Sequence, residues 1–156
     1  MKPQLLLLSF LLLTVFSCKS EDDINPENKI LGLYEFKLEK VGNNYELDFV
    51  NTLDFKSDGT VYGEAFTTKA GTNEVLGYRY YFNGIYEIKN DKVSISDIES
   101  FHSIFMDTFY SPKSDLVNLE EGMAPEEYLI KDEFQTLQIV CPANANCFDM
   151  EFKKIK

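Results

Sequence analysis

Hydrophobic and polar residues alternate along most of the chain with a period of two, which is typical of strands that bury one face. The alternation starts at Tyr34, Phe36 and Leu38, which are separated by charged residues. The later segments with this pattern are residues 47–55, 60–68, 76–88, 93–95, 128–130, 134–141 and 147–154. About eight short strands predict an all-β fold with minor α content, a single antiparallel β-barrel or a strongly curved meander.

Polar turns separate these segments. Asp58-Gly59 is a hairpin signal, because this pair readily takes the positive φ angles of tight turns. After residue 100 the alternation weakens, and residues 114–121 are expected to form the one short helix. Ser114 would cap its N-terminus and Gly122 would end it.

The N-terminus has the pattern of a secretory signal. Lys2 precedes an apolar run over residues 5–16, and a run of twelve is too short to span a bilayer, which takes about 20 residues. Residues 15–18, Val-Phe-Ser-Cys, resemble the lipobox of bacterial lipoproteins, in which the cysteine becomes the lipidated first residue. The resemblance implies a signal peptide over residues 1–17 and lipidation of Cys18; the alternative is a plain signal peptide with a chance cysteine.

Residues 18–29 are charged and polar, and we expect them to be an acidic tether. They resemble the acidic segment that follows the lipidated cysteine in Bacteroidetes-type lipoproteins and directs export to the cell surface. A merely solvated spacer is the alternative. The expected location is therefore the outer membrane, lipid-anchored and facing outward, with the periplasmic face as the alternative.

The remaining residues, 30–156, suit one β domain. The whole chain of 156 residues carries 15 Lys and Arg against 26 Asp and Glu, a formal net charge of -11. This balance argues against nucleic acid as a partner, because phosphates require a basic face. It also gives no attraction to anionic lipid head groups, so the expected membrane contact is the lipid anchor.

Cys141 and Cys147 form an even pair once Cys18 is lipidated. Export would place them in an oxidising compartment, where nearby cysteines tend to form disulfides. Two free thiols or half of a metal site are the alternatives. Strict alternation would point the two cysteines to opposite faces of their strands, and either a bulge or a bridge within the loop would resolve that conflict.

Three segments resemble small envelope domains. Residues 30–34 stand where these domains show a Leu-x-Gly-x-aromatic opening, residues 53–61 match their second hairpin, and residues 83–95 match a Gly-x-Tyr, turn and strand segment. The families are the META domain, related to a bacterial heat-shock lipoprotein, and the lipocalin-like lipoprotein domains. The META motif Gly-Cys-Asn is absent. The resemblance implies a β domain with no catalytic residue.

The chain offers little that indicates catalysis. His102 is the sole histidine, and Ser100 and Ser103 beside it lack the context of a nucleophile. The carboxylate pairs at residues 120–121 and 126–127 are more simply explained as a solvated loop. We therefore expect no enzyme, no cofactor and no metal site.

The aromatic segment is the best candidate for a binding function. Tyr78, Tyr80 and Phe82 share the face expected to point inward, where they would either line a ligand cavity or fill the barrel as core. The opposite face would carry a partner-binding patch consisting of Tyr62, Phe66, Arg79 and Tyr81. The expected function is binding of a small apolar ligand or a protein partner, and the alternative is a structural or stress-response component of the envelope.

Overall fold

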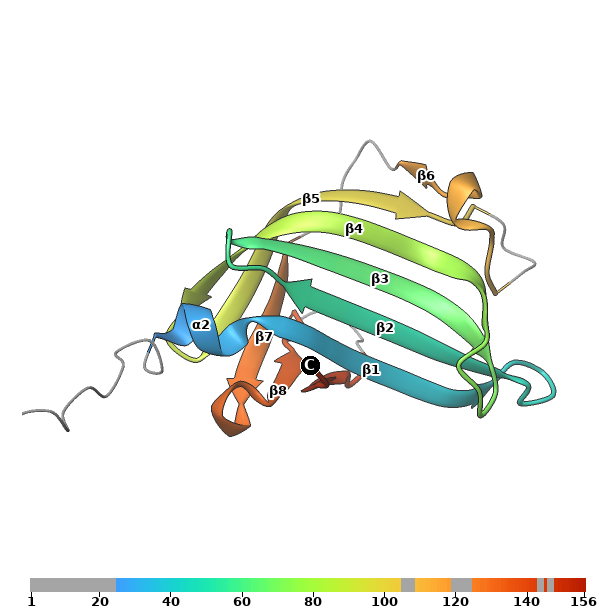
Figure 1. The fold of residues 1–156 in the computed structure, drawn as a ribbon, viewed down its shortest axis with the longest axis horizontal. Helices are drawn as coiled ribbons and strands as arrows, with labels where there is room; N and C mark the ends of the chain where they lie inside the picture. The colour runs from blue at the N-terminus through green and yellow to red at the C-terminus, as the bar shows by residue number, and fades with distance from the viewer. Residues whose placement is uncertain (1–24, 105–108, 119–124, 143–144, 146–147) are drawn as a thin grey trace, which may run out of the picture.

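A computed structural model of the chain describes residues 25–104, 109–118, 125–142, 145 and 148–156 (Figure 1). The regular elements are α2 (Pro26–Ile30), β1 (Gly32–Val41), β2 (Leu47–Phe55), β3 (Thr60–Lys69), β4 (Val75–Lys89), β5 (Lys92–His102), η2 (Lys113–Asp115), β6 (Val117–Asn118), β7 (Glu126–Lys131), η3 (Asp132–Phe134), β8 (Thr136–Ile139) and β9 (Glu151–Lys154). The predicted signal peptide, Cys18 and Cys147 lie outside the described residues.

The strands form a closed antiparallel barrel of eight strands. Around the ring the order is β1, β2, β3, β4, β5, β7, β8 and β9, and β9 pairs with β1 to close it. Each strand of the ring therefore lies beside the next one along the chain, apart from β6, which pairs with the end of β5 outside the ring. The all-β barrel predicted from the alternation is confirmed.

The strands of the ring differ in length, and this divides the barrel into two halves. β1 to β5 contain 9 to 15 residues each, whereas β7, β8 and β9 contain 6, 4 and 4. β9 pairs only with Tyr34 and Glu35 of β1, and β7 pairs only with the first four residues of β5. In Figure 1 the sheet of β1 to β5 extends well beyond β7 and β8. We call this extension, from Phe36 of β1 and Asp97 of β5 onward, the open half, and the rest the closed half.

The closed half is filled by a hydrophobic core. Its largest buried side chains are Tyr34, Leu53, Phe55, Val61, Phe82, Val93, Ile95, Leu137, Phe152 and Tyr128. The Phe55 ring meets those of Tyr34 and Tyr86 edge-on, with centroids 5.6 and 5.1 Å apart. Edge-to-face pairs of this kind stabilise a core beyond the area that they bury.

The short helix α2 closes the end of this half. The Asn25 side chain accepts a hydrogen bond from the Glu27 backbone N–H at 3.1 Å, and Pro26 occupies the first turn, so the local sequence favours a helix start. Ile30 at the helix end is fully buried in the core. Burying a side chain of this size contributes about 1.5–3 kcal/mol. The helix α2 thus occupies the last residues of the predicted tether, 26–29.

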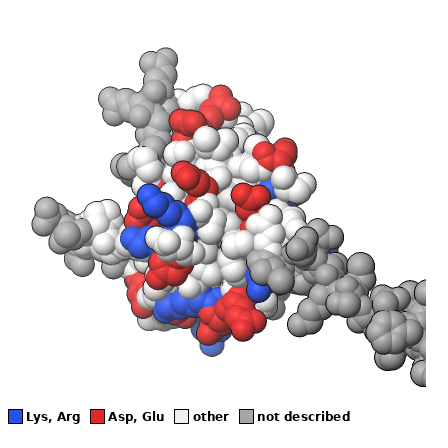
Figure 2. Space-filling view, turned by 90° about the vertical axis from the view of Figure 1, so that its left-hand side faces the viewer, with Lys and Arg blue, Asp and Glu red and all other residues white. Residues whose placement is uncertain are grey.

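Seen from the end that α2 covers, acidic and basic side chains are interspersed over the surface (Figure 2). Among the described residues no helix is long and apolar enough to cross a membrane.

The helix predicted over residues 114–121 is wrong where the structure describes it. Residues 113–115 form the single 3-10 turn η2, and Val117 and Asn118 form β6. The reason is tertiary: β6 pairs with Phe101 and His102 at the end of β5, which local propensity does not show. Leu116, between η2 and β6, is buried.

Candidate binding site in the open half of the barrel

A β-bulge in β4 decides which side chains enter the open half. Ala65 of β3 pairs with Tyr80, but the next residue, Phe66, pairs with Tyr78, so Arg79 is an extra residue without a partner on β3. A bulge of this kind interrupts the alternation of side chains between the two faces of a strand. As a result Arg79 and Tyr80, although adjacent, both point into the barrel.

The Arg79 guanidinium lies against β2 inside the open half. Its Nη2 donates to the Val50 carbonyl and to Asn51 Oδ1, both at 3.1 Å, and its centre is 4.4 Å from the centroid of the Phe49 ring. Its Nε is buried and has no hydrogen-bond partner in the part of the chain that the structure describes. No described carboxylate forms an ion pair with it, and burial lowers the Arg79 pKa. Arg79 as a whole is partly buried, and a bound anion would lower the cost of its unpaired charge.

Three polar side chains of β4 and β5 share the inner face of the barrel with Arg79. Tyr80 donates its hydroxyl to Asn51 Oδ1 at 3.3 Å and stacks on His102 with centroids 5.5 Å apart. Ser100 is fully buried and pairs with Phe82, so it faces the same interior. Ser100 Oγ and His102 Nε2 are both buried, and no described residue forms a hydrogen bond with either atom. Buried polar atoms are normally satisfied, so these groups mark a site that can accept further hydrogen bonds.

One carboxylate faces this interior from β7. Glu126 pairs with the buried Ile95 and accepts a hydrogen bond from the Tyr128 hydroxyl at 2.5 Å. Burial raises the Glu126 pKa, and burial together with the Glu126 charge raises the pKa of Tyr80 to about 12. Glu126 is therefore satisfied by Tyr128 and does not neutralise the guanidinium.

Apolar side chains surround these polar groups. Leu38 and Phe49 face each other across β1 and β2, and Phe49 contacts the ring of Phe109 at 5.8 Å between centroids. Leu38 lies on the inner face yet is 37% exposed, and Phe109 is 47% exposed. Partly exposed hydrophobic side chains thus lie beside the polar groups of the open half.

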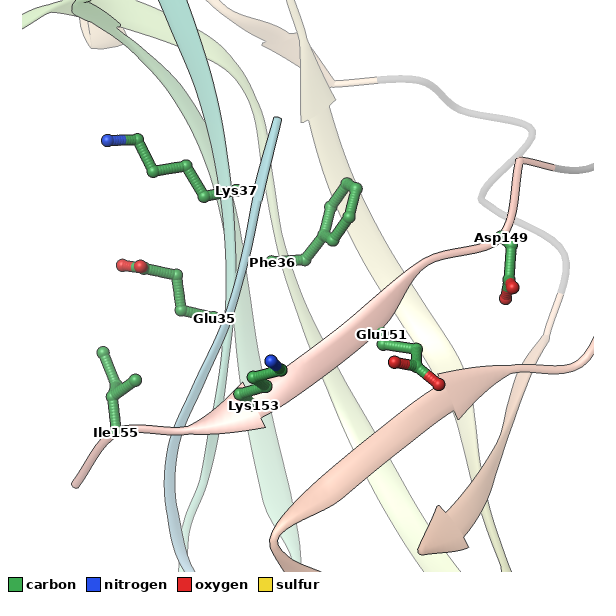
Figure 3. Close-up of a pocket in the computed structure, with 7 residues that line it drawn as sticks. All are labelled: Glu35, Phe36, Lys37, Asp149, Glu151, Lys153 and Ile155. Atoms are coloured by element: carbon green, nitrogen blue, oxygen red, sulfur yellow. The ribbon is translucent and has the colours of Figure 1, made fainter. Parts of the chain in front are cut away.

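A hollow of about 470 Å³ lies where β9 diverges from β1. Figure 3 shows Glu35 and Lys37 on one side of β1 and Phe36 on the other, with Glu151 across on β9. The Phe36 ring contacts those of Phe148 and Phe152 at 6.1 and 5.9 Å between centroids. This aromatic group borders the gap in the barrel wall.

A buried carboxylate holds the loops at the rim of the open half. Asp48, 1% exposed, binds Lys37 Nζ at 2.9 Å and accepts the backbone N–H groups of Lys40 and Gly71, each at 2.9 Å. The Lys40 and Lys37 hydrogen bonds lead the causes that lower the Asp48 pKa to about 2. Asp48 therefore ties the end of β1 to the loop after β3.

The outer face of β3 and β4 carries an aromatic row. Its members are Tyr62, Phe66, Tyr78 and Tyr81, continued by Phe101, whose ring stacks on Tyr81 with centroids 4.6 Å apart. Lys113 from η2 lies over this row, 5.4, 4.8 and 5.2 Å from the centroids of Tyr62, Tyr78 and Tyr81. Its Nζ also donates to Glu64 at 2.7 Å and to the Tyr62 hydroxyl at 2.8 Å. A segment of the chain itself thus occupies much of the expected partner patch.

The predicted faces of the aromatic segment are correct except at the bulge. Tyr80 and Phe82 point inward as predicted, and Tyr62, Phe66 and Tyr81 lie on the outer face. Tyr78 was expected inside but lies outside, and Arg79 was expected outside but lies inside. The two exchange faces because the bulge adds a residue between them. The run of five bulky residues over 78–82 is the one feature of the sequence that indicates a break there in the alternation of inward and outward side chains.

The structure adds residues that the sequence did not single out for the interior site. These residues are Asn51, Ser100, Glu126 and Tyr128, none of which the sequence alone assigns to a site. The described residues contain no cluster of three or more His, Cys, Asp or Glu side chains suited to hold a metal. Cys141 follows β8 and is exposed, but Cys147 is outside the described residues, so their disulfide stays a prediction.

Comparison of the chain with protein-family models, with curated proteins and with solved structures gives no significant match. The functional assignment therefore rests on the side chains of the open half.

Proposed function

We propose that this protein is a lipid-anchored protein of the outer membrane whose barrel binds a small, largely apolar molecule in its open half. The observation that carries the proposal is the set of buried polar groups without partners, Arg79 Nε, Ser100 Oγ and His102 Nε2, behind an exposed apolar rim. Ligand sites combine an apolar lining with a few convergent polar groups in this way. The consecutive order of strands around the ring is also that of lipocalin-type up-and-down barrels.

Catalysis is not part of the proposal. His102 is the sole histidine, and its Nε2 has no hydrogen-bond partner among the described residues. A general base acting on a nucleophile needs such a partner within hydrogen-bond reach. The arrangement favours recognition of a molecule over its chemical conversion.

Binding can be tested with the neutral fluorescent probe N-phenyl-1-naphthylamine. The protein is best prepared with Cys18→Ala, so that detergent does not compete for the probe. We expect saturable fluorescence enhancement, weakened at least tenfold by Leu38→Arg at the rim. Ile85→Arg is the matched control, because Ile85 is 46% exposed and follows the inward Gly84 in the closed half. Absence of saturable binding would favour a structural role without a ligand.

The anchor is tested separately. Cys18→Ala should move the protein from the membrane fraction to the soluble fraction after cell lysis, because the lipid attachment residue is lost. If the variant still sediments with membranes, Cys18 is not the anchor.

A further inference from the structure

The position of Arg79 indicates what kind of molecule the open half binds. Its guanidinium is held in place by the Val50 carbonyl, the Asn51 side chain and the Phe49 ring, so its orientation is set before any ligand arrives. Both protein acceptors are neutral, and no described residue supplies the counter-charge. A guanidinium in a partly buried site is best complemented by a planar anion that accepts two parallel hydrogen bonds.

Two other groups on the same inner face can also bind an acceptor. Ser100 Oγ and His102 Nε2 can each donate a hydrogen bond, and both are buried without a partner among the described residues. Glu126, a described carboxylate that faces this interior, is held by Tyr128, and its burial disfavours the charged form. The inner face therefore offers one guanidinium and two possible donors to an anion.

The approach to Arg79 is apolar. Phe49 lies against the guanidinium, Leu38 faces Phe49 from β1, and Phe36 begins the aromatic group at the wall gap. An apolar body attached to an anion on Arg79 would contact these hydrophobic side chains.

We propose that the open half binds carboxylates with an apolar body, with the carboxylate on the Arg79 guanidinium and the apolar part along Phe49, Leu38 and Phe36. This rests on the interior binding proposed above and names the class of its ligand.

Displacement of N-phenyl-1-naphthylamine by decanoate and by decan-1-ol tests the proposal. The two competitors share the same alkyl chain and differ in the head group. The ratio of the concentrations at which they displace the probe therefore isolates the effect of the charge. For the protein with Arg79 intact, decanoate should displace the probe at a concentration at least tenfold lower than decan-1-ol. Arg79→Met should abolish this preference while the probe itself still binds. Lys113→Met, which removes a positive charge from the outer face, is the matched control and should keep the preference.

The outcomes separate the two proposals. If the probe does not bind, the interior binding function fails and this inference falls with it. If the probe binds but the two competitors are equal, or the preference survives Arg79→Met, only the carboxylate inference is overturned. Circular dichroism shows whether Arg79→Met is folded. If it is not, Arg79→Lys decides, because loss of the planar fork should reduce the preference, and an unchanged preference would contradict the proposal.

Discussion

The contact between Gly63 of β3 and Phe82 of β4 is a sharp test of the core. These residues are paired across the two strands, and the Phe82 ring lies directly over the glycine. A Cβ atom built on Gly63 would lie 2.0 Å from Phe82 Cε1 and 2.2 Å from Cζ. Phe82 is 2% exposed, so its ring has little free space into which to move. Gly63→Ala should therefore overpack the closed half.

The magnitude follows from two opposing effects. Overpacking a core by a methyl group costs about 1–3 kcal/mol. Replacing a glycine in a strand by alanine returns about 0.5–1 kcal/mol, because the unfolded chain loses conformational freedom. We expect a net loss of about 1–2 kcal/mol in the free energy of unfolding, or a fall of roughly 4–8 °C in Tm for a domain of this size.

Urea denaturation followed by circular dichroism measures this loss, and Phe82→Leu provides the matched second variant. A leucine has no ring to meet the new methyl group, so the double variant should be at least about 1 kcal/mol more stable than the sum of the single effects predicts. Additive effects, or a Gly63→Ala variant as stable as the parent, would refute the packing of Phe82 on Gly63 and the register of β3 and β4.

Three further predictions follow from the other contacts. Because the folded pKa of Asp48 is about 2 against 3.8 for the free side chain, its stabilising effect is present above pH 3.8 and is lost as the pH falls toward 2. The difference in urea midpoint between the parent and Asp48→Asn should therefore be large at pH 7 and small at pH 2; an equal difference at both would contradict the role of its charge. Lys113→Met should speed the amide hydrogen exchange of residues 110–116 by about fivefold, because an exposed ion pair with a cation–π contact contributes about 1 kcal/mol. Unchanged exchange would show that Lys113 does not hold this segment. Intact mass with and without reductant should differ by two protons if Cys141 and Cys147 are bridged, and free thiols in exported protein would exclude the disulfide.

The order of strands was predictable because its signals are local. The alternation in residues 34–38 and 47–55 identifies which side chains are buried, and Asp58-Gly59 fixes the hairpin between β2 and β3. There Gly59 has a φ of 85° and the Lys56 N–H donates to the Thr60 carbonyl at 2.9 Å. Period-two patterns and turn residues need only neighbours in sequence to be read.

The site was only partly predictable. Tyr80 and Phe82 are inward as the alternation requires, but whether β4 contains a bulge depends on how many of its residues oppose β3, which is a property of the pair of strands. Whether Ser100 Oγ and His102 Nε2 find a hydrogen-bond partner likewise depends on which groups the barrel places near them. The run of bulky residues 78–82 hints at the bulge without placing it, and the sequence contains no local signal for the missing hydrogen-bond partners.

The sequence by itself thus determined an acidic chain with an antiparallel β domain, because composition and short-range periodicity carry that information; its export remains a prediction. The tertiary structure alone decided that α2 closes one end, that short β7 to β9 leave the other half open, and that Arg79 rather than Tyr78 enters it. Each of these depends on contacts between segments distant in the chain. Ile30 is buried only because α2 packs on the end of the barrel. Arg79 faces inward only because β4 has one more residue than β3 at the bulge.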